Sequence, residues 1–335
     1  MKRSRAGVYG ALAVVIAVAV GSAIAIATTG AQSHPPPAPP RPGTYVLGQP
    51  QGPAAVAVAT ARELKKFRNH RSPEFATTPA WLQDFSAMPD GDLLGWHVDL
   101  GTGVDGWYNK EVASYTGSPA NLRIEGGKLV IEANKEPQDA GEVYTSARVS
   151  TVGIKSFQYG RIDVVAKLPG GTGTWPAIWL IAQNDKYLNE TPKKDPQRYL
   201  NDGELDIVET VFPGIVYSIA QARLSVSGLP NEHDIRYPLP NDTRAFHEYS
   251  LEWTPTRLTF LLDNKAVYTL NKAPSWNWQE WPYDQPYYLV MNLALGGVWG
   301  GHDAAQYPPS GINNKDLPQS MEIRSVAYYP YLGRT

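Results

Sequence analysis

The chain of 335 residues contains no cysteine. A disulfide framework, a thiol nucleophile and a Cys-ligated zinc site are therefore excluded. The histidines show no metal-ligand spacing such as H-x-x-x-H, and no glycine-rich loop precedes a helical pattern. The sequence thus predicts neither a catalytic metal nor a bound nucleotide, and we expect no cofactor to be required.

Charge is distributed unevenly, although the formal net charge is only −2. Residues 1–80 hold 9 basic and 2 acidic residues, whereas residues 81–335 hold 21 basic and 30 acidic residues and all ten tryptophans. An acidic folded part is a poor partner for nucleic acid, because phosphates are bound by Lys and Arg. The second part is long enough for one sizeable core, and we expect it to be a single domain and a monomer.

The first residues have the pattern of an export signal. Three basic residues at positions 2, 3 and 5 precede an uncharged, mostly apolar run over 6–27, and small residues follow at 28–31. This pattern predicts a signal peptide over 1–31. The run is close to the roughly 20 residues that span a bilayer, so an uncleaved signal anchor is an equal alternative. We therefore expect a secreted or membrane-anchored protein, which contacts the membrane only through this segment.

Residues 32–80 have the composition of a linker. Six prolines lie between Pro35 and Pro42, which favours an extended polyproline spacer. The basic stretch 54–68 has the composition of a short helix or, more commonly, of a solvated linker. We place the boundary of the folded domain at residue 81.

From Trp81 onward, short alternating runs of apolar and polar residues replace helical periodicity. Such runs lie at 161–166, 258–262, 265–270 and 321–329. Asp263-Asn264 has the composition of a hairpin turn between two of them. Residues 287–293 are apolar on both faces, as expected for a central strand. The pattern predicts an all-β sandwich of the jelly-roll kind.

The segment 203–210 (GELDIVET) carries three acids on one predicted strand. Glu204 and Asp206 are two residues apart and share a face. In a regular strand Glu209 would point to the opposite, apolar face. One extra residue, a β-bulge around 207–208, would return Glu209 to the face of the other two acids.

A row of three acids suits the hydrolysis of a glycosidic bond. A retaining glycosidase needs two carboxyls about 5–5.5 Å apart, one as nucleophile and one as acid/base. Glu204 and Glu209 can lean together over Asp206, and their mutual repulsion raises the pKa of one of them. A solvated acidic strand face is the alternative. The apolar residues at 205, 207, 208 and 211 argue against it, because they indicate a buried strand.

The sequence resembles glycoside hydrolase family 16, and within it the laminarinase-like branch with the bulged E-x-D-x-x-E motif. The similar segments are 106–117, 144–153, 159–180, 203–209, 246–264 and 281–301. The resemblance implies a concanavalin A-like jelly roll of two antiparallel sheets with a concave glycan cleft. It also implies retaining hydrolysis of internal β-1,3-glucosidic bonds of laminarin-type glucans. Glu204 would be the nucleophile, Glu209 the acid/base, and Asp206 the residue that tunes the nucleophile.

The resemblance implies further sugar contacts at Asn109, Trp175, Trp179 and Trp299. Trp175 and Trp179 lie in the segment that lines the glycone side of the family's cleft, and Trp299 is similar to an outer platform. Core packing is the usual role of a buried tryptophan, and we expect it for Trp253.

Two positions depart from the family pattern. Gln221 stands where the family typically has a histidine near the sugar, so the resemblance implies that Gln221 binds substrate. Glutamine can donate a hydrogen bond but cannot carry a proton between carboxylates, so rate or linkage preference can differ. Arg324 stands where the family often has an aspartate that binds a structural calcium, which argues against calcium here. The long polar loop 183–202 is expected either to wall one end of the cleft or to be a solvated insertion.

Three alternatives stay open at this point. Family members that lack the catalytic glutamates bind or sense β-glucan without cleaving it, although both glutamates are present here. The same mechanism could act on mixed-linkage glucan, a galactan or a cell-envelope polysaccharide. Finally, a sugar hydroxyl could replace water in the second step, which gives transglycosylation.

Overall fold

The computed structural model describes residues 72–333, except 92, 94, 138–142, 196–197, 213–214, 225–230, 239–244 and 301–310. The expected export segment 1–31 and most of the expected linker lie outside the described residues. Phe75 is buried and pairs with Tyr331, and the backbone N–H of Ala76 donates to Pro330. Contacts with the end of the chain therefore begin a few residues before Trp81, and the domain boundary itself stays a prediction.

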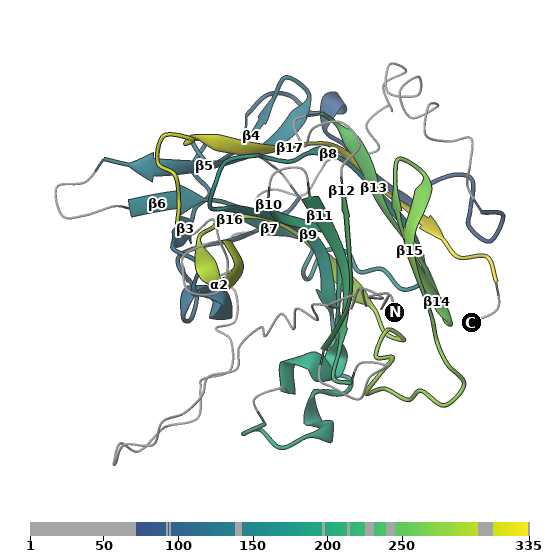
Figure 1. Cartoon of the computed structure of the whole chain (residues 1–335). Coiled ribbons are helices and arrows are strands. Elements are labelled where there is room, and N and C mark those ends of the chain that lie inside the picture. Colours follow the sequence, from purple (N-terminus) through teal and green to yellow (C-terminus); the bar gives the residue numbers. More distant parts are fainter. Residues whose placement is uncertain are drawn as a thin grey trace, which may run out of the picture. The chain divides into compact units, whose positions relative to one another are not determined.

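The described chain forms two β-sheets (Figure 1). The ten-stranded sheet contains β1 (Trp81–Asp84), β3 (Ala113–Tyr115), β4 (Leu122–Glu125), β5 (Lys128–Glu136), β6 (Val143–Ser146), β8 (Gly160–Lys167), β13 (His247–Thr254), β14 (Arg257–Leu262), β15 (Lys265–Asn271) and β17 (Gln319–Pro330). The seven-stranded sheet contains β2 (His97–Asp99), β7 (Arg148–Ser150), β9 (Thr174–Ala182), β10 (Glu204–Phe212), β11 (Ile215–Ala222), β12 (Asn231–Pro238) and β16 (Tyr287–Leu295). The order across the latter is β12-β11-β10-β9-β16-β7-β2.

The helical elements in the described part of the chain are single turns. They are η2 (Phe85–Ala87), η3 (Gly106–Lys110), η4 (Leu188–Glu190), η5 (Arg198–Asp202) and α2 (Gly297–Gly300). Among the described residues, no helix has the length and apolar character needed to cross a membrane.

The hydrophobic core lies between the two sheets. Alternate residues of β8, β10 and β16, such as Val164, Leu205 and Leu289, are fully buried in one cluster, because side chains of a strand alternate between its faces. Trp253 belongs to this cluster, as expected, and so does Trp281. The predicted all-β jelly-roll sandwich is thereby confirmed.

The predicted hairpin is also present. β14 and β15 are antiparallel, and the two residues between them, Asp263 and Asn264, have φ angles of 48° and 64°. Two-residue hairpins favour turns with positive φ because their twist matches that of the strands, and Asn and Asp adopt such angles more readily than most residues.

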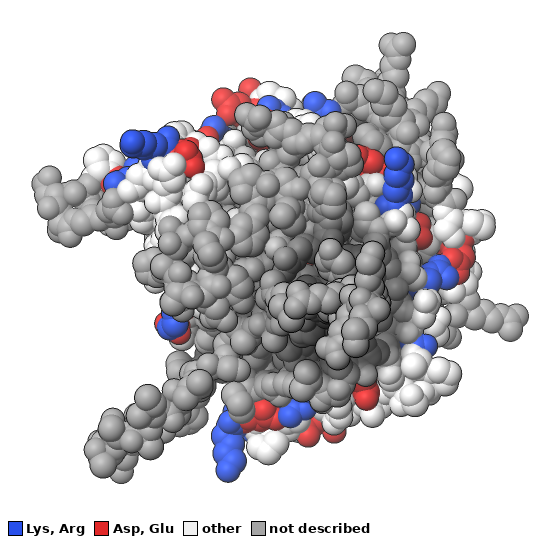
Figure 2. Space-filling model, viewed as in Figure 1, with Lys and Arg blue, Asp and Glu red and all other residues white. Residues whose placement is uncertain are grey.

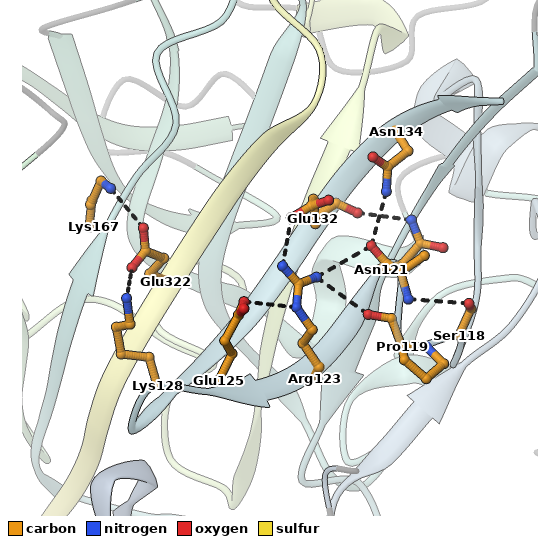
Figure 3. A network of polar contacts seen from close by, with 11 residues as sticks. Ser118, Pro119, Asn121, Arg123, Glu125, Lys128, Glu132, Asn134, Lys167 and Glu322 are labelled. Atoms are coloured by element: carbon orange, nitrogen blue, oxygen red, sulfur yellow. Dashed lines mark hydrogen bonds and ion pairs between the residues drawn. The ribbon is translucent and has the colours of Figure 1, made fainter. Parts of the chain in front are cut away.

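The outward face of the ten-stranded sheet carries paired charges (Figure 3). Glu322 of β17 accepts hydrogen bonds from Lys128 at 2.5 Å and from Lys167 at 2.7 Å, and Arg123 of β4 pairs with Glu125 and Glu132 at 2.9 Å each. On the face shown in Figure 2, the described acidic and basic side chains are likewise interspersed around the periphery.

Candidate active site

Strand β10 contains the predicted bulge. β10 advances three residues from Asp206 to Glu209, while β9 advances two residues from Trp179 to Ala177. The register between β10 and β11 shifts at the same place. The two intervening residues, 207–208, are both buried in the core. The extra residue therefore returns Glu209 to the outward face of the sheet, on which Asp206 lies.

The sheet register places the carboxylates among the aromatic residues of the neighbouring strands. The cross-strand rows on the outward face are Tyr288–Ile181–Glu204–Gln221, Val290–Trp179–Asp206–Ile219, Arg148–Asn292–Ala177–Glu209–Tyr217 and Ala294–Trp175. β9, β10 and β11 curve along their length, as Figure 1 shows. The three acids, Gln221 and both tryptophans of β9 are thus brought to one face.

The side-chain amide of Gln221 bridges two of the acids. Its Nε2 donates to Glu204 Oε1 at 2.6 Å and to Asp206 Oδ2 at 3.1 Å. An amide nitrogen carries two hydrogens, so one side chain serves both carboxyl groups. Gln221 is therefore a hydrogen-bond donor to the carboxyl groups of Glu204 and Asp206.

Burial raises the pKa values of both Glu204 and Asp206. It raises the pKa of Asp206 to about 7, against the opposing hydrogen bonds with Gln221 and Glu204. Burial, followed by the negative charges of Asp206 and Glu209, raises the pKa of Glu204 well above its usual range, whereas the Arg148 cation acts in the opposite direction. The two carboxyl groups also act on each other: their interaction raises the pKa of Glu204 and lowers that of Asp206. The pair therefore titrates as a unit and retains a proton near neutral pH.

Glu209 is held by Trp175. The indole Nε1 donates to Glu209 Oε1 at 2.9 Å, and both side chains are only 8% exposed. Trp299 packs edge-on against Trp175 at 5.5 Å and against Tyr217 at 4.6 Å between ring centroids. With Val211, Ile219 and Ala294 these rings form an apolar cluster separate from the main core. Trp175 thus orients a carboxyl group, and Trp299 supports Trp175.

Trp179 lies in a second polar group that includes Arg148. The guanidinium of Arg148 stacks between Trp107 and Trp179, at 4.6 and 4.8 Å from the ring centroids, and its Nε donates to Asp99 at 3.0 Å. Arg148 was not among the site residues predicted from the sequence. The available signal was its position in 144–153, one of the segments that resemble the family.

Asn109 lies in the turn η3, whose backbone is unusual. Trp107 and Tyr108 have φ angles of 57° and 66°, which residues with a Cβ rarely adopt and which tend to occur at functional sites. The Asn109 side chain acts to lower the pKa of the buried Glu111, against the larger effect of burial, which raises it. Asn109 therefore interacts with Glu111, two residues further along the sequence.

The position expected for a calcium ligand does not fit calcium. The guanidinium of Arg324 lies 3.9 Å from the ring centroid of Phe246, and a cation in this place would repel a second cation. Among the described residues, no group of three or more His, Asp or Glu side chains is arranged to hold a metal ion.

A bulged strand that carries two glutamates on the outward face of a jelly roll, with indoles beside them, is the arrangement of a glycoside hydrolase. The sequence profile of glycosyl hydrolases family 16 matches residues 109–313, and the chain belongs to this family. It is 32% identical over 272 residues to a β-glucanase of Rhodothermus marinus, covering 79% of this chain and 88% of that protein.

Solved structures show the same fold. The X-ray structure of the laminarinase from Rhodothermus marinus is similar with a TM-score of 0.67 at 32% identity, over 78% of this chain and 100% of the other. The crystal structure of SCLam, a non-specific endo-β-1,3(4)-glucanase, is similar with a TM-score of 0.64 at 30% identity, over 78% of this chain and 92% of the other.

Proposed function

We propose that this protein is a retaining endo-β-1,3-glucanase that hydrolyses internal bonds of laminarin-type glucans. The observation that carries the proposal is the bulge in β10, which places Glu209 on the outward face with Glu204 and Asp206. Similarity to a laminarinase at 32% identity supports the substrate class. Because the glucan is uncharged, it is recognised by stacking of its sugar rings on indole side chains and by hydrogen bonds to its hydroxyl groups.

In the first step Glu204 attacks the anomeric carbon, and protonated Glu209 gives its proton to the departing glycosidic oxygen. In the second step Glu209 removes a proton from water, which attacks the glucosyl ester of Glu204 and restores both carboxyl groups. For this attack the proton of the pair moves from Glu204, whose pKa is raised well above its usual range, to Asp206, so that the nucleophile is ionised. The amide of Gln221 stabilises the ionised nucleophile through its bond to Oε1.

The test replaces each glutamate separately. Glu204→Gln should abolish the release of reducing ends from laminarin while the melting temperature is retained. With azide as an external nucleophile, Glu204→Ala should form the α-glucosyl azide and Glu209→Ala the β-anomer, which distinguishes the two roles. Glu132→Gln is the matched control, since Glu132 lies in the ten-stranded sheet and pairs with Arg123. Undiminished turnover by Glu204→Gln would refute the assignment.

The second candidate is hydrolysis of mixed-linkage β-1,3/1,4-glucan, which the similarity to a non-specific endo-β-1,3(4)-glucanase favours. Purified protein should be assayed on β-1,3-, mixed-linkage and β-1,4-glucans and on agarose, with product lengths resolved. Products longer than the substrate would indicate transglycosylation. Binding to laminarin without any cleavage by the wild type would indicate a non-catalytic glucan-binding protein.

We also propose that the chain is exported, so that the catalytic domain lies outside the cytoplasm. The basic residues before the apolar run over 6–27 support this proposal. Sequencing of the mature N-terminus and fractionation would separate a cleaved signal from an anchor. Mature protein in the cytoplasm would contradict export.

A further inference from the structure

A directed chain of hydrogen bonds leads from Trp179 to Glu111. Trp179 Nε1 donates to Asn292 Oδ1 at 2.8 Å, Asn292 Nδ2 donates to the Tyr115 hydroxyl oxygen at 3.2 Å, and the Tyr115 O–H donates to Glu111 Oε2 at 2.5 Å. An indole N–H can only donate, so Asn292 accepts through Oδ1 and donates through Nδ2, and Tyr115 gives its own hydroxyl proton to Glu111.

The residues that follow Trp179 in this series of hydrogen bonds are shielded from water. Asn292, Tyr115 and Glu111 are 4%, 1% and 7% exposed. A buried polar group that loses its partner is costly, so each of these bonds restrains the next one. Rotation of the Trp179 ring would leave Asn292 Oδ1 without its indole donor.

Glu111, the last acceptor in this series of hydrogen bonds, is held in place by backbone contacts. Its backbone pairs with Gly296, just beyond the end of β16, and the N–H of the next residue, Val112, donates to Leu295 at 3.0 Å. The carboxylate is thus fixed to the strand that carries Asn292.

The second restraint on Trp179 acts on the face of the ring. Arg148 stacks on the indole at 4.8 Å and is itself held by Asp99 and Trp107. Trp179 is therefore fixed at its N–H edge by one set of residues and on one face by another. The register pairs Trp179 with Asp206, so the ring lies directly beside the three acids.

We propose that Glu111 is a positioning residue that fixes the indole of Trp179 through Tyr115 and Asn292, and so sets the affinity for the sugar bound beside the carboxylates. The inference deepens the proposed function and rests on it. A ring held in place before the sugar binds loses less conformational entropy on binding, which strengthens the complex. Glu111 acts here without touching the substrate.

Tyr115→Phe is the sharpest test, because it removes one hydroxyl group and breaks the chain in the middle. Titration with laminari-oligosaccharides in a Glu204→Gln background should show a dissociation constant raised about tenfold. With Glu204 present, KM should rise by a similar factor while kcat changes little, because uniform binding is lost. Tyr144→Phe is the matched control. Tyr144 is a buried tyrosine whose hydroxyl donates to Asn314 at 2.8 Å, and it takes no part in the hydrogen bonds from Trp179 to Glu111.

Glu111 is tested by a pair of variants. Glu111→Gln keeps an acceptor for Tyr115 and should retain most of the affinity, whereas Glu111→Ala should match Tyr115→Phe. Equal affinity of Tyr115→Phe and Tyr144→Phe, or equal loss in both Glu111 variants, would overturn the proposal.

A measurement without substrate separates this proposal from the proposed function. The near-UV circular dichroism difference between wild type and Trp179→Phe defines the signal of the fixed indole. Tyr115→Phe should reduce this signal, and Tyr144→Phe should not. An unchanged signal would refute the positioning role, whereas a wild type that neither binds nor cleaves β-1,3-glucan would refute only the proposed function.

Discussion

Gln221 Nε2 lies 2.6 Å from Glu204 Oε1, and the two residues are direct partners across β10 and β11. The same nitrogen lies 3.1 Å from Asp206 Oδ2. A hydrogen bond donated to a carboxylate favours its charged form. Gln221 therefore opposes the effect of burial on the pair, and it does so without a titratable proton of its own.

Gln221→Leu removes this donor at similar volume. The pKa of Glu204, which must be ionised to attack, should rise further without this donor, so the acid limb of the pH profile of kcat/KM should move to higher pH. At mildly acidic pH we expect a loss of about tenfold, with a smaller loss at alkaline pH. A variant whose profile is lowered equally at every pH would show that Gln221 acts only on substrate binding.

Asp206→Asn should stabilise the protein at neutral pH although it impairs activity. The pKa of Asp206 is raised from 3.8 to about 7 on folding, so between these values the native state binds more protons than the unfolded state. The free energy of unfolding of the wild type therefore falls as pH rises through this window. Asparagine avoids the ionisation, and the gain should be on the order of 2–4 kcal/mol at pH 8.

Chemical denaturation of both proteins between pH 4 and pH 8 measures this gain. At pH 4, close to the unfolded-state value of 3.8, the native carboxyl group is protonated and ionisation has cost the wild type little stability, so the difference between the two proteins should be smallest there. A constant difference across the range would exclude the buried ionisation as its cause.

Trp175→Phe deletes the indole N–H that donates to Glu209. Glu209 then loses an orienting hydrogen bond, and kcat/KM should fall by about tenfold or more. Trp96→Phe is the matched control, because Trp96 is buried and its Nε1 has no hydrogen-bond partner among the residues that the structure describes. It should lower stability without a comparable effect on kcat/KM, and equal kinetic losses in the two variants would argue against an orienting role.

Glu322→Gln should lower stability at neutral pH and leave catalysis unchanged. Hydrogen bonds from Lys128 and Lys167, together with their charges, lower the pKa of Glu322 against the opposing effect of burial (Figure 3). A lowered pKa stabilises the native state above the unfolded value, and this contribution is lost as pH falls through the folded value. We expect a deficit of about 1 kcal/mol at pH 7 and low salt, which vanishes in acid. A deficit that persists in acid would point to packing instead.

Much of the fold follows from local patterns. Alternation with period two identified β8, β14 and β17, and a run that is apolar on both faces identified β16, since each strand must bury one face or both. The bulge in β10 was predictable because three acids and the apolar residues between them fit one strand only with an extra residue. The strand order was not predictable by these rules, since register depends on which apolar faces meet in the core.

The amino-acid sequence by itself determined the all-β class and the bulged carboxylate strand, because both are encoded within single segments of the chain. Tertiary structure decided the partners of each carboxyl group: Gln221 from β11 at Glu204, and Trp175 from β9 at Glu209. It also placed Glu111, Tyr115 and Asn292 behind Trp179, although 181 positions separate the ends of this set. Hydrogen bonds require contact within about 3 Å, and only the packing of distant strands brings such groups together.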